Sequence, residues 1–178
     1  MPIIQVNNLS KQFKSLTAVD GISFSVNEGE VFGFLGPNGA GKTTTINILC
    51  TLLSATSGTA KIAGLDCAKD PDRVRSSIGI IFQDTTLDTG LTAYENLKFH
   101  AYLYNLDRAL TERRIDEMLS VVELQSRKHD LIKNFSGGMK RRLEIARGLL
   151  HYPRVLFLDE PTIGLDPQTR NTIWDFIN

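Results

Sequence analysis

A chain of 178 residues with 42% apolar residues is long enough to form one domain around a buried core. Its 20 basic and 20 acidic residues cancel, so the overall charge gives no electrostatic argument for nucleic acid or an anionic membrane surface, and we expect no nucleic-acid partner. The N-terminus lacks the pattern of a signal peptide, and no stretch approaches the roughly 20 apolar residues that span a bilayer. The two cysteines lack metal-binding spacing, which favours reduced thiols in a cytosolic protein.

The first third of the chain has the pattern of short strands separated by turns. Apolar runs or alternation at strand length predict strands at residues 3–6, 22–26, 31–35, 59–63 and 78–82. The run at 31–35 ends in a Gly-Pro-Asn-Gly sequence, which is typical of a loop. Residues 42–53 follow this loop and are long enough for a helix.

The middle of the chain is helical in composition. Helices are expected at residues 92–104 and 112–122, and the second places four apolar side chains on one face: Ile115, Met118, Leu119 and Val122. Ser136 is a favourable N-cap for a further helix with one apolar stripe, made of Met139, Leu143, Ala146 and Leu150.

The end of the chain begins with a strand pattern at residues 155–158, which are continuously apolar. Asp166 followed by Pro167 predicts the start of a last helix, because aspartate is a good N-cap and proline suits the first helical position. Strand, loop, helix and strand in this order favour an α/β fold with a parallel sheet and a helical insertion.

The segment from Gly36 to Thr43 matches the phosphate-loop pattern G-x-x-x-x-G-K-[ST]. Glycines allow several backbone N–H groups to point at one anion, and the helix that begins near Gly41 adds its positive end. Lys42 can reach the outer phosphates of ATP, and the Thr43 hydroxyl can bind Mg²⁺. The alternative is a glycine-rich turn that contains a lysine by chance, and the position between a strand and a helix disfavours it. The candidate nucleotide-binding residues are Gly36, Pro37, Asn38, Gly39, Ala40, Gly41, Lys42, Thr43 and Thr44.

Two carboxylates, Asp159 and Glu160, follow the strand expected at residues 155–158. Ligands of parallel sheets gather at the carboxyl ends of strands, where Asp159 can hold the water shell of Mg²⁺. Glu160 can polarise the water that attacks the γ-phosphate. A strand that leaves the core for polar solvent would give the same pattern, but the phosphate loop favours the catalytic interpretation.

Three further segments narrow the class of protein. Residues 134–142, Asn-Phe-Ser-Gly-Gly-Met-Lys-Arg-Arg, resemble the signature motif of ABC ATPases. The tripeptide at residues 164–166, Gly-Leu-Asp, is similar to their D-loop, and Gln83 is similar to their Q-loop glutamine. The resemblance implies a P-loop NTPase (RecA-like) core with an N-terminal antiparallel β-layer and a helical signature subdomain. The core would comprise residues 1–87 and 152–178 and the helical subdomain residues 88–151, as one cassette.

The resemblance also implies roles for single residues. Ser136, Gly137 and Gly138 would bind the γ-phosphate of a nucleotide held by the opposite subunit, because glycines at a capped helix start expose backbone N–H groups. Gln83 would contact Mg²⁺ and transmit motion to a membrane partner, and Asp166 would be both an N-cap and the D-loop aspartate. The implied catalytic residues are Glu160, Lys42 and Gln83, and the implied metal ligands are Thr43, Gln83 and Asp159.

Other positions carry less specific expectations. Phe13 stands where the family places an aromatic that stacks on adenine, with a half-buried aromatic in a β-layer as the equal alternative. Phe135 and Met139 replace the family's usual leucine and glutamine, and Phe135 keeps an apolar anchor. The basic side chains of Lys140, Arg141 and Arg142 are interpreted as the solvated face of the signature helix. No role is assigned to the three histidines, His100, His129 and His151.

The family works with ATP and Mg²⁺ as a head-to-tail pair of cassettes, which implies a homodimer bound to a separate membrane permease on the inner face of the cell membrane. Residues 92–97 and 139–144 resemble most the branch that serves ABC-2-type export permeases. A soluble ABC ATPase acting on DNA or ribosomes is an alternative, disfavoured by the short interval between residues 84 and 135 and by the single cassette. A small-molecule P-loop kinase would have no use for Glu160 beside Asp159, and a fragment that binds nucleotide without hydrolysing it is a third alternative.

The C-terminal end carries its own expectation, because ABC cassettes continue beyond residue 178 with another strand and a histidine. In the family this strand lies between the strands that correspond to residues 31–35 and 155–158. We therefore expect an incomplete cassette in which these two strands pair directly or another segment or chain fills the gap. The 178-residue chain should then hydrolyse ATP slowly and self-associate.

Overall fold

The computed structural model describes residues 1–81 and 85–158. The chain divides into two compact units, Met1–Ile78 and Gly79–Asn178, and each is described by itself. Within the described ranges, no helix combines the length and the apolar content needed to cross a bilayer. Four residues with predicted roles lie outside the described residues, namely Gln83, Asp159, Glu160 and Asp166.

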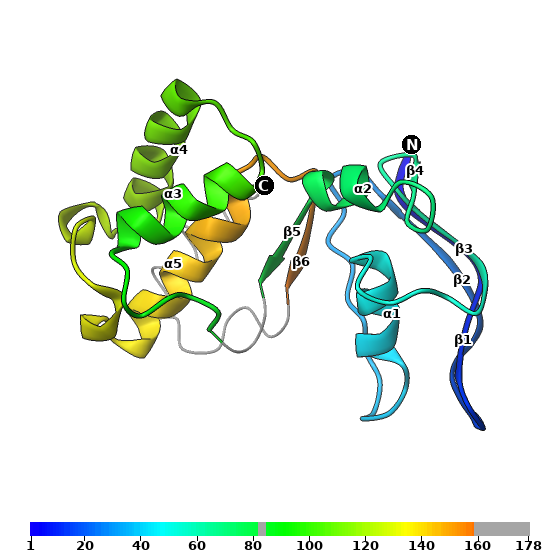
Figure 1. Cartoon of the computed structure of the whole chain (residues 1–178). Helices are drawn as coiled ribbons and strands as arrows, with labels where there is room; N and C mark the ends of the chain where they lie inside the picture. The colour runs from blue at the N-terminus through cyan, green and yellow to red at the C-terminus, as the bar shows by residue number, and fades with distance from the viewer. Residues whose placement is uncertain (82–84, 159–178) are drawn as a thin grey trace. The chain divides into compact units, whose positions relative to one another are not determined.

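The first unit is built on an antiparallel sheet, as the resemblance implied (Figure 1). Strands β1 (Pro2–Phe13) and β2 (Leu16–Asn27) form a long hairpin, and β3 (Ser57–Ile62) pairs with the other edge of β1. The short β4 (Leu65–Asp66) completes the order β2-β1-β3-β4. Helix α1 (Lys42–Leu49) contacts β2 and β3, and α2 (Pro71–Ser77) contacts β4.

Both strands of the hairpin are longer than the predicted segments 3–6 and 22–26. The polar pair at residues 7–8 interrupts the apolar alternation, but Asn8 lies in an irregularity of the ladder rather than at its end. Its φ is 45°, and its N–H donates to Ser23 Oγ at 2.8 Å. Gly58 of β3 faces this point, since a Cβ there would lie 2.2 Å from the Asn8 carbonyl oxygen. Strand β1 therefore continues through residues 7–8, although their polar side chains alone would predict that it ends there.

The predicted strand at residues 31–35 is wrong, because these residues form no strand. Phe32 and Phe34 pack instead against Phe24 of β2, with ring centroids 5.3 Å apart in each pair. Val31 and Leu35 are 75% and 94% exposed. Among the described strands β6 pairs with β5. The expectation that residues 31–35 and 155–158 pair directly, or that another segment or chain fills the gap between them, stays a prediction. The expected self-association of the chain stays a prediction.

Helix α1 ends at Leu49, four residues before the predicted end. The N–H of Leu52 donates to the Asn47 carbonyl at 2.8 Å, and Thr51 has a φ of 61°. The left-handed backbone at Thr51 turns the chain out of the helix, and the Leu52 N–H then satisfies one of the last helical carbonyls.

In the described part of the second unit, β5 (Ile78–Ile81) pairs with β6 (Val155–Leu158), and three helices accompany them. The first residue of β5 belongs to the other unit. The three helices are α3 (Ala93–Leu103), α4 (Arg108–Val121) and α5 (Gly137–Leu149), with short 3₁₀ turns at Gln125–Arg127 and Ile132–Asn134. The helices pack around one apolar core, which buries the first predicted stripe and, apart from the partly buried Met139, the second. Its completely buried members include Ile115, Met118, Leu119, Val122, Leu143, Ala146 and Leu150.

Local signals fix where these helices begin. Thr92 forms a capping box with Glu95, and the Asp107 side chain accepts from the Leu110 N–H at 2.9 Å. The Asp107 cap starts α4 at Arg108, four residues before the predicted start at residue 112. At the other end of α5, the buried Arg114 of α4 donates to the carbonyls of Leu149 and Leu150, at 2.6 and 3.0 Å. The two bonds from Arg114 thus satisfy carbonyl groups at the C-terminal end of α5, which would otherwise have no partner within the helix.

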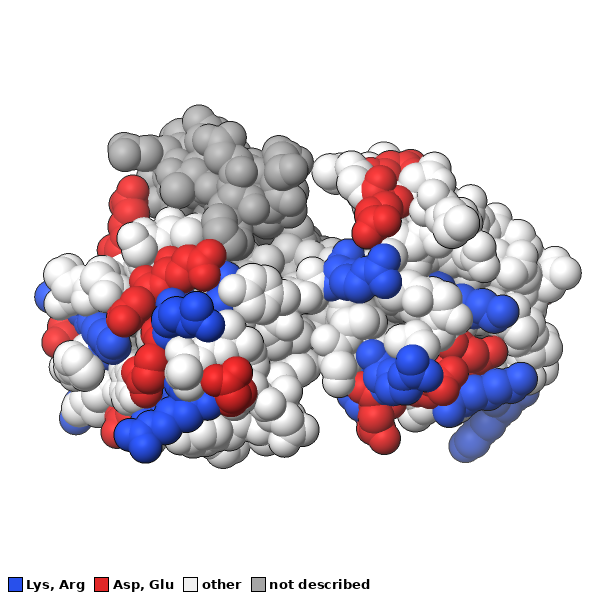
Figure 2. All heavy atoms as spheres, turned by 90° about the horizontal axis from the view of Figure 1, so that it is seen from above, with Lys and Arg blue, Asp and Glu red and all other residues white. Residues whose placement is uncertain are grey.

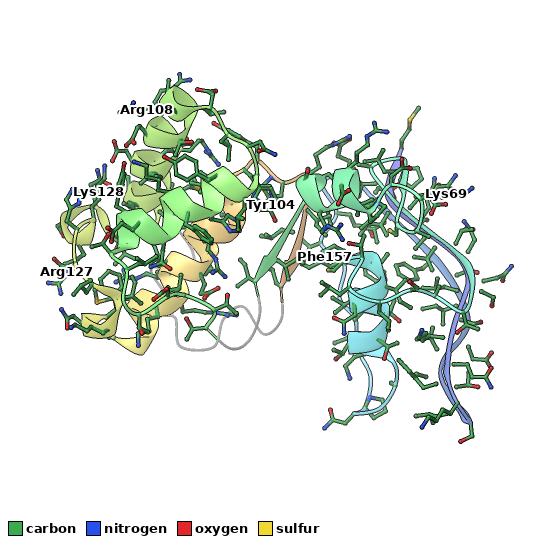
Figure 3. The ribbon with its side chains drawn as sticks, in the orientation of Figure 1. Lys69, Tyr104, Arg108, Arg127, Lys128 and Phe157 are labelled. Carbon is green, nitrogen blue, oxygen red and sulfur yellow. The ribbon has the colours of Figure 1, made fainter. Side chains whose placement is uncertain are left out.

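A half-buried histidine of α3, His100, is expected to make the stability of the second unit depend on pH. The ring of His100 lies 4.8 Å from that of Tyr104 and 5.7 Å from that of His151 (Figure 3 labels Tyr104). Its Nε2 is buried without a hydrogen-bond partner among the described residues. Burial lowers the pKa of His100 from 6.5 to about 3, and the charges of Arg147 and His151 act in the same direction.

We expect the free energy of unfolding to fall as the pH is lowered from about 6.5 towards 3, because the unfolded chain takes up a proton at His100 and the folded chain does not. One proton gives a slope of up to about 1.4 kcal/mol per pH unit. Urea titrations followed by circular dichroism between pH 7.5 and 5 should show this slope reduced in His100→Gln. Replacing the exposed His129 with glutamine is the control. Equal slopes in both variants would contradict the assignment.

Candidate nucleotide-binding site

The predicted phosphate loop leads directly into α1, as its sequence indicated. Gly39 and Gly41 have φ values of 85° and 82°, a region that favours glycine. Gly41 is required for a second reason, because a Cβ there would lie 2.3 Å from the Ala18 carbonyl oxygen of β2. The loop is thus packed closely onto the sheet at the point where the helix begins.

The N-terminus of α1 is open to a ligand. Its N-cap residue is Gly41, which has no side chain to accept from the first N–H groups of the helix. The N–H of Thr45 donates to the Gly41 carbonyl at 2.9 Å, so the intrahelical ladder begins only there. The N–H groups of Lys42, Thr43 and Thr44 lie within that first turn, where the helix dipole also favours negative charge. An anion is the ligand that this arrangement suits.

Lys42 places a positive charge against the same loop. Its Nζ donates to the carbonyl oxygens of Gly36 and Pro37, at 2.6 and 2.8 Å. Residues 36–40 are exposed, so the ammonium group lies at an accessible surface next to the open helix end. Backbone donors, one ammonium group and the hydroxyls of Thr43 and Thr44 form a donor set that fits the phosphates of a nucleotide.

Fewer of the described residues bear on how adenine and Mg²⁺ would bind. Phe13, at the end of β1, is 42% exposed, and Lys11 Nζ lies 5.0 Å from its ring centroid. An exposed ring can stack on a base, and its role stays a prediction. The Thr43 side chain is exposed, while the other two implied metal ligands lie outside the described ranges. Within those ranges, no group of three histidine, cysteine or acidic side chains could hold a metal ion.

The predicted signature segment forms the start of α5 in the second unit. Ser136 Oγ accepts from the Met139 N–H at 3.3 Å, which confirms Ser136 as the N-cap. Ser136 and Gly137 are exposed, and a Cβ on Gly137 would meet nothing within 4 Å. Phe135 is buried and anchors the segment, as expected, while Met139 packs against the apolar core. This helix start therefore presents backbone N–H groups to the surface.

The interpretation of residues 140–142 as a solvated face needs correction. Arg141 is 9% exposed and therefore buried. Arg142 is partly buried and forms an ion pair with Glu123 of the turn after α4, with 3.4 Å between Arg142 Nη1 and Glu123 Oε2. The sequence could not indicate this because the helix packs against neighbours on more than one side.

Sequence reasoning missed two residues of α5, Glu144 and Arg147. Both contact Thr86, which follows Gln83 by three positions. The only local signal was an acidic and a basic residue three positions apart on one helix, which usually indicates an exposed pair.

A phosphate loop before an α-helix, joined to a β-layer, defines a nucleotide-binding domain of the P-loop class. The family model described as ABC transporter matches residues 19–163, and the chain belongs to this family. This confirms the resemblance stated on the signature segment.

Curated relatives agree with the branch that the sequence favoured. The chain is 43% identical to the linearmycin resistance ATP-binding protein LnrL of Bacillus subtilis, over 98% of this chain and 56% of that protein. It is 44% identical to the daunorubicin/doxorubicin resistance ATP-binding protein DrrA of Streptomyces peucetius, over 98% and 53%. The chain thus spans about half the length of the curated relatives it matches.

Solved structures agree on the fold. An ATP-binding subunit of an ABC transporter matches with a TM-score of 0.90 and 31% identity, over 99% of this chain and 73% of that chain. A dimeric ATP-binding cassette bound to ADP and Pi matches with a TM-score of 0.83 and 29% identity, over 98% and 81%. The predicted fold class, a P-loop cassette with a β-layer and a helical signature region, is confirmed.

Proposed function

We propose that this chain is the ATP-binding and hydrolysing part of an ABC exporter. The observation that carries the proposal is the phosphate loop, where Gly41 leaves the start of α1 uncapped and Lys42 adds an ammonium group. Glu160 acts as the base that polarises the attacking water, and Phe13 stacks on adenine. Mg²⁺, bound by Thr43, Gln83 and Asp159, would neutralise charge on the phosphates.

The protein works as a homodimer in this proposal. Ser136, Gly137 and Gly138 form a second exposed helix start that suits an anion, and one copy would offer it to the nucleotide held by the other. The structural neighbour that is a dimeric cassette with ADP and Pi supports this arrangement. Asp166 would lie at the same interface.

The work of the dimer is coupled to a separate membrane permease, and we place the protein in the cytoplasm at the inner face of the membrane. The names of the relatives, which describe resistance to linearmycin and to daunorubicin and doxorubicin, favour export.

Large apolar side chains on α3 offer a surface for the permease. Those of Phe99, Tyr102 and Leu103 are 56–62% exposed, and a protein partner would remove them from water. In Figure 2 acidic and basic side chains are intermingled on the visible face of each unit.

Co-purification tests the coupling. A tagged cassette with this sequence, extended to the length of its curated relatives, should bring down one integral membrane protein from detergent-solubilised membranes. Phe99→Ser with Tyr102→Ser should weaken this association, whereas Leu52→Ser should not, because Leu52 is an exposed apolar residue of the other unit. Recovery with ribosomes or DNA, and without a membrane protein, would favour a soluble ABC ATPase instead.

A further inference from the structure

A buried carboxylate in the signature helix holds a loop segment that is distant in sequence. Glu144 of α5 is 1% exposed. Its Oε1 accepts from the Thr86 N–H at 2.6 Å, from the Thr85 hydroxyl at 3.1 Å and from the Thr86 hydroxyl at 3.4 Å. Thr85 and Thr86 belong to no helix or strand, so the bond from the Thr86 N–H supplies a partner that regular structure would otherwise provide.

Arg147, one turn further along α5, completes the attachment. It donates through Nη2 to Glu144 Oε2 at 2.8 Å and through Nη1 to the Thr86 carbonyl at 3.2 Å, and Nη2 also contacts the Thr86 hydroxyl. The backbone N–H, the carbonyl and the hydroxyl of Thr86 are thus all bound by two side chains of one helix. A buried ion pair adds little net stability compared with apolar packing, but its directional bonds fix a polar segment in one place.

The chain is held against the same helix before residue 82. Strand β5 approaches the end of α5 so closely that a Cβ on Gly79 would lie 2.4 Å from the Gly148 carbonyl oxygen. A Cβ on Gly148 would lie 2.9 Å from Ile81 Cγ1, and Ile81 is completely buried. Residues 79–81 and 85–86 are therefore both attached to α5, on either side of the position of Gln83 in the sequence.

We propose that Glu144 and Arg147 are positioning residues that fasten the segment following Gln83 to the signature helix. This inference rests on the proposed function, in which Gln83 contacts the nucleotide's metal ion and the start of α5 binds the nucleotide of the opposite copy. Neither Glu144 nor Arg147 needs to touch nucleotide. Their effect is to keep a fixed distance between the segment that follows Gln83 and helix α5 when nucleotide binds. The segment then cannot shift without the helix.

The test compares the steady-state phosphate release of cassettes extended to family length. Glu144→Gln removes the charge that holds Thr86 and Arg147, and we expect kcat to fall about tenfold or more, because small displacements near a reacting centre are costly. The KM for ATP should change less than about twofold, because the phosphate loop is unaltered. Glu123→Gln is the matched control, since Glu123 is exposed and the change breaks an ion pair with another arginine of α5, the partly buried Arg142.

A milder pair of variants guards against a folding defect. Thr86→Val replaces the hydroxyl with a methyl group and should also lower kcat, whereas Thr86→Ser keeps the hydroxyl and should retain kcat. Hydrogen exchange of the residue 86 amide should be slow in the unmodified cassette and faster in Glu144→Gln. Unchanged kcat in Glu144→Gln despite faster exchange would overturn the inference, as would an equal loss in Glu123→Gln. An unmodified cassette without any turnover would instead refute the proposed function, and this inference with it.

Discussion

Replacing Lys42 with alanine is expected to remove most of the affinity for ATP. The ammonium group lies at the phosphate loop, within hydrogen-bond distance of the Gly36 and Pro37 carbonyls. A hydrogen bond to a charged group contributes about 1.5–3 kcal/mol, which corresponds to a loss of roughly 10- to 150-fold in affinity. The fold should survive, because the two carbonyls belong to an exposed loop and can bond to water instead.

A nucleotide-binding titration measures this effect, with Lys61→Ala as the control. Lys61 is an exposed lysine of β3, so its replacement makes the same change in charge away from the loop. Unchanged affinity in Lys42→Ala would remove the assignment of residues 36–44 as the nucleotide-binding loop.

Replacing Glu160 with glutamine should leave ATP binding intact and nearly abolish hydrolysis. The amide has a similar shape, but it cannot accept a proton from the attacking water as a carboxylate does. General base catalysis contributes about 10²- to 10⁴-fold, so phosphate release by a cassette of family length should fall by a factor of that order. Near-normal phosphate release in Glu160→Gln would show that another group is the base.

The helices of the second unit could be predicted from sequence because their signals are local. Caps such as Thr92 and Ser136 lie next to the turns that they start, and an apolar stripe needs only a few neighbouring positions. Helix α2 was missed although Asp70 and Pro71 carry a cap signal, because seven residues are too few for a clear stripe. Short elements depend on what packs against them.

Strands were predicted less well because a strand exists only with a partner. Residues 31–35 have the composition of a strand, yet they pair with no described strand, and Phe32 packs against Phe24 instead. Conversely, β1 continues through the polar residue Asn8 because Ser23 and Gly58 accommodate it from the neighbouring strands. Neither outcome can be predicted from the residues of the segment alone, because both depend on neighbours that are distant in sequence.

The same distinction separates the two parts of the candidate site. The phosphate loop is one contiguous motif, so its residues, its open helix end and its lysine could all be predicted. The contacts of Glu144 and Arg147 with Thr86 join residues 58 and 61 positions apart. Such contacts depend on the packing of β5 against α5, which no local pattern determines.

The most direct test of the account is the mass of the Glu160→Gln cassette in solution, measured by light scattering with and without Mg-ATP. If two copies enclose the nucleotide between the phosphate loop of one and the signature segment of the other, Mg-ATP should convert this variant from monomer to a stable dimer. Adding Ser136→Arg should prevent the dimer, whereas adding Ser120→Arg, at an exposed position of α4, should not. A variant that binds ATP and stays monomeric would contradict the account.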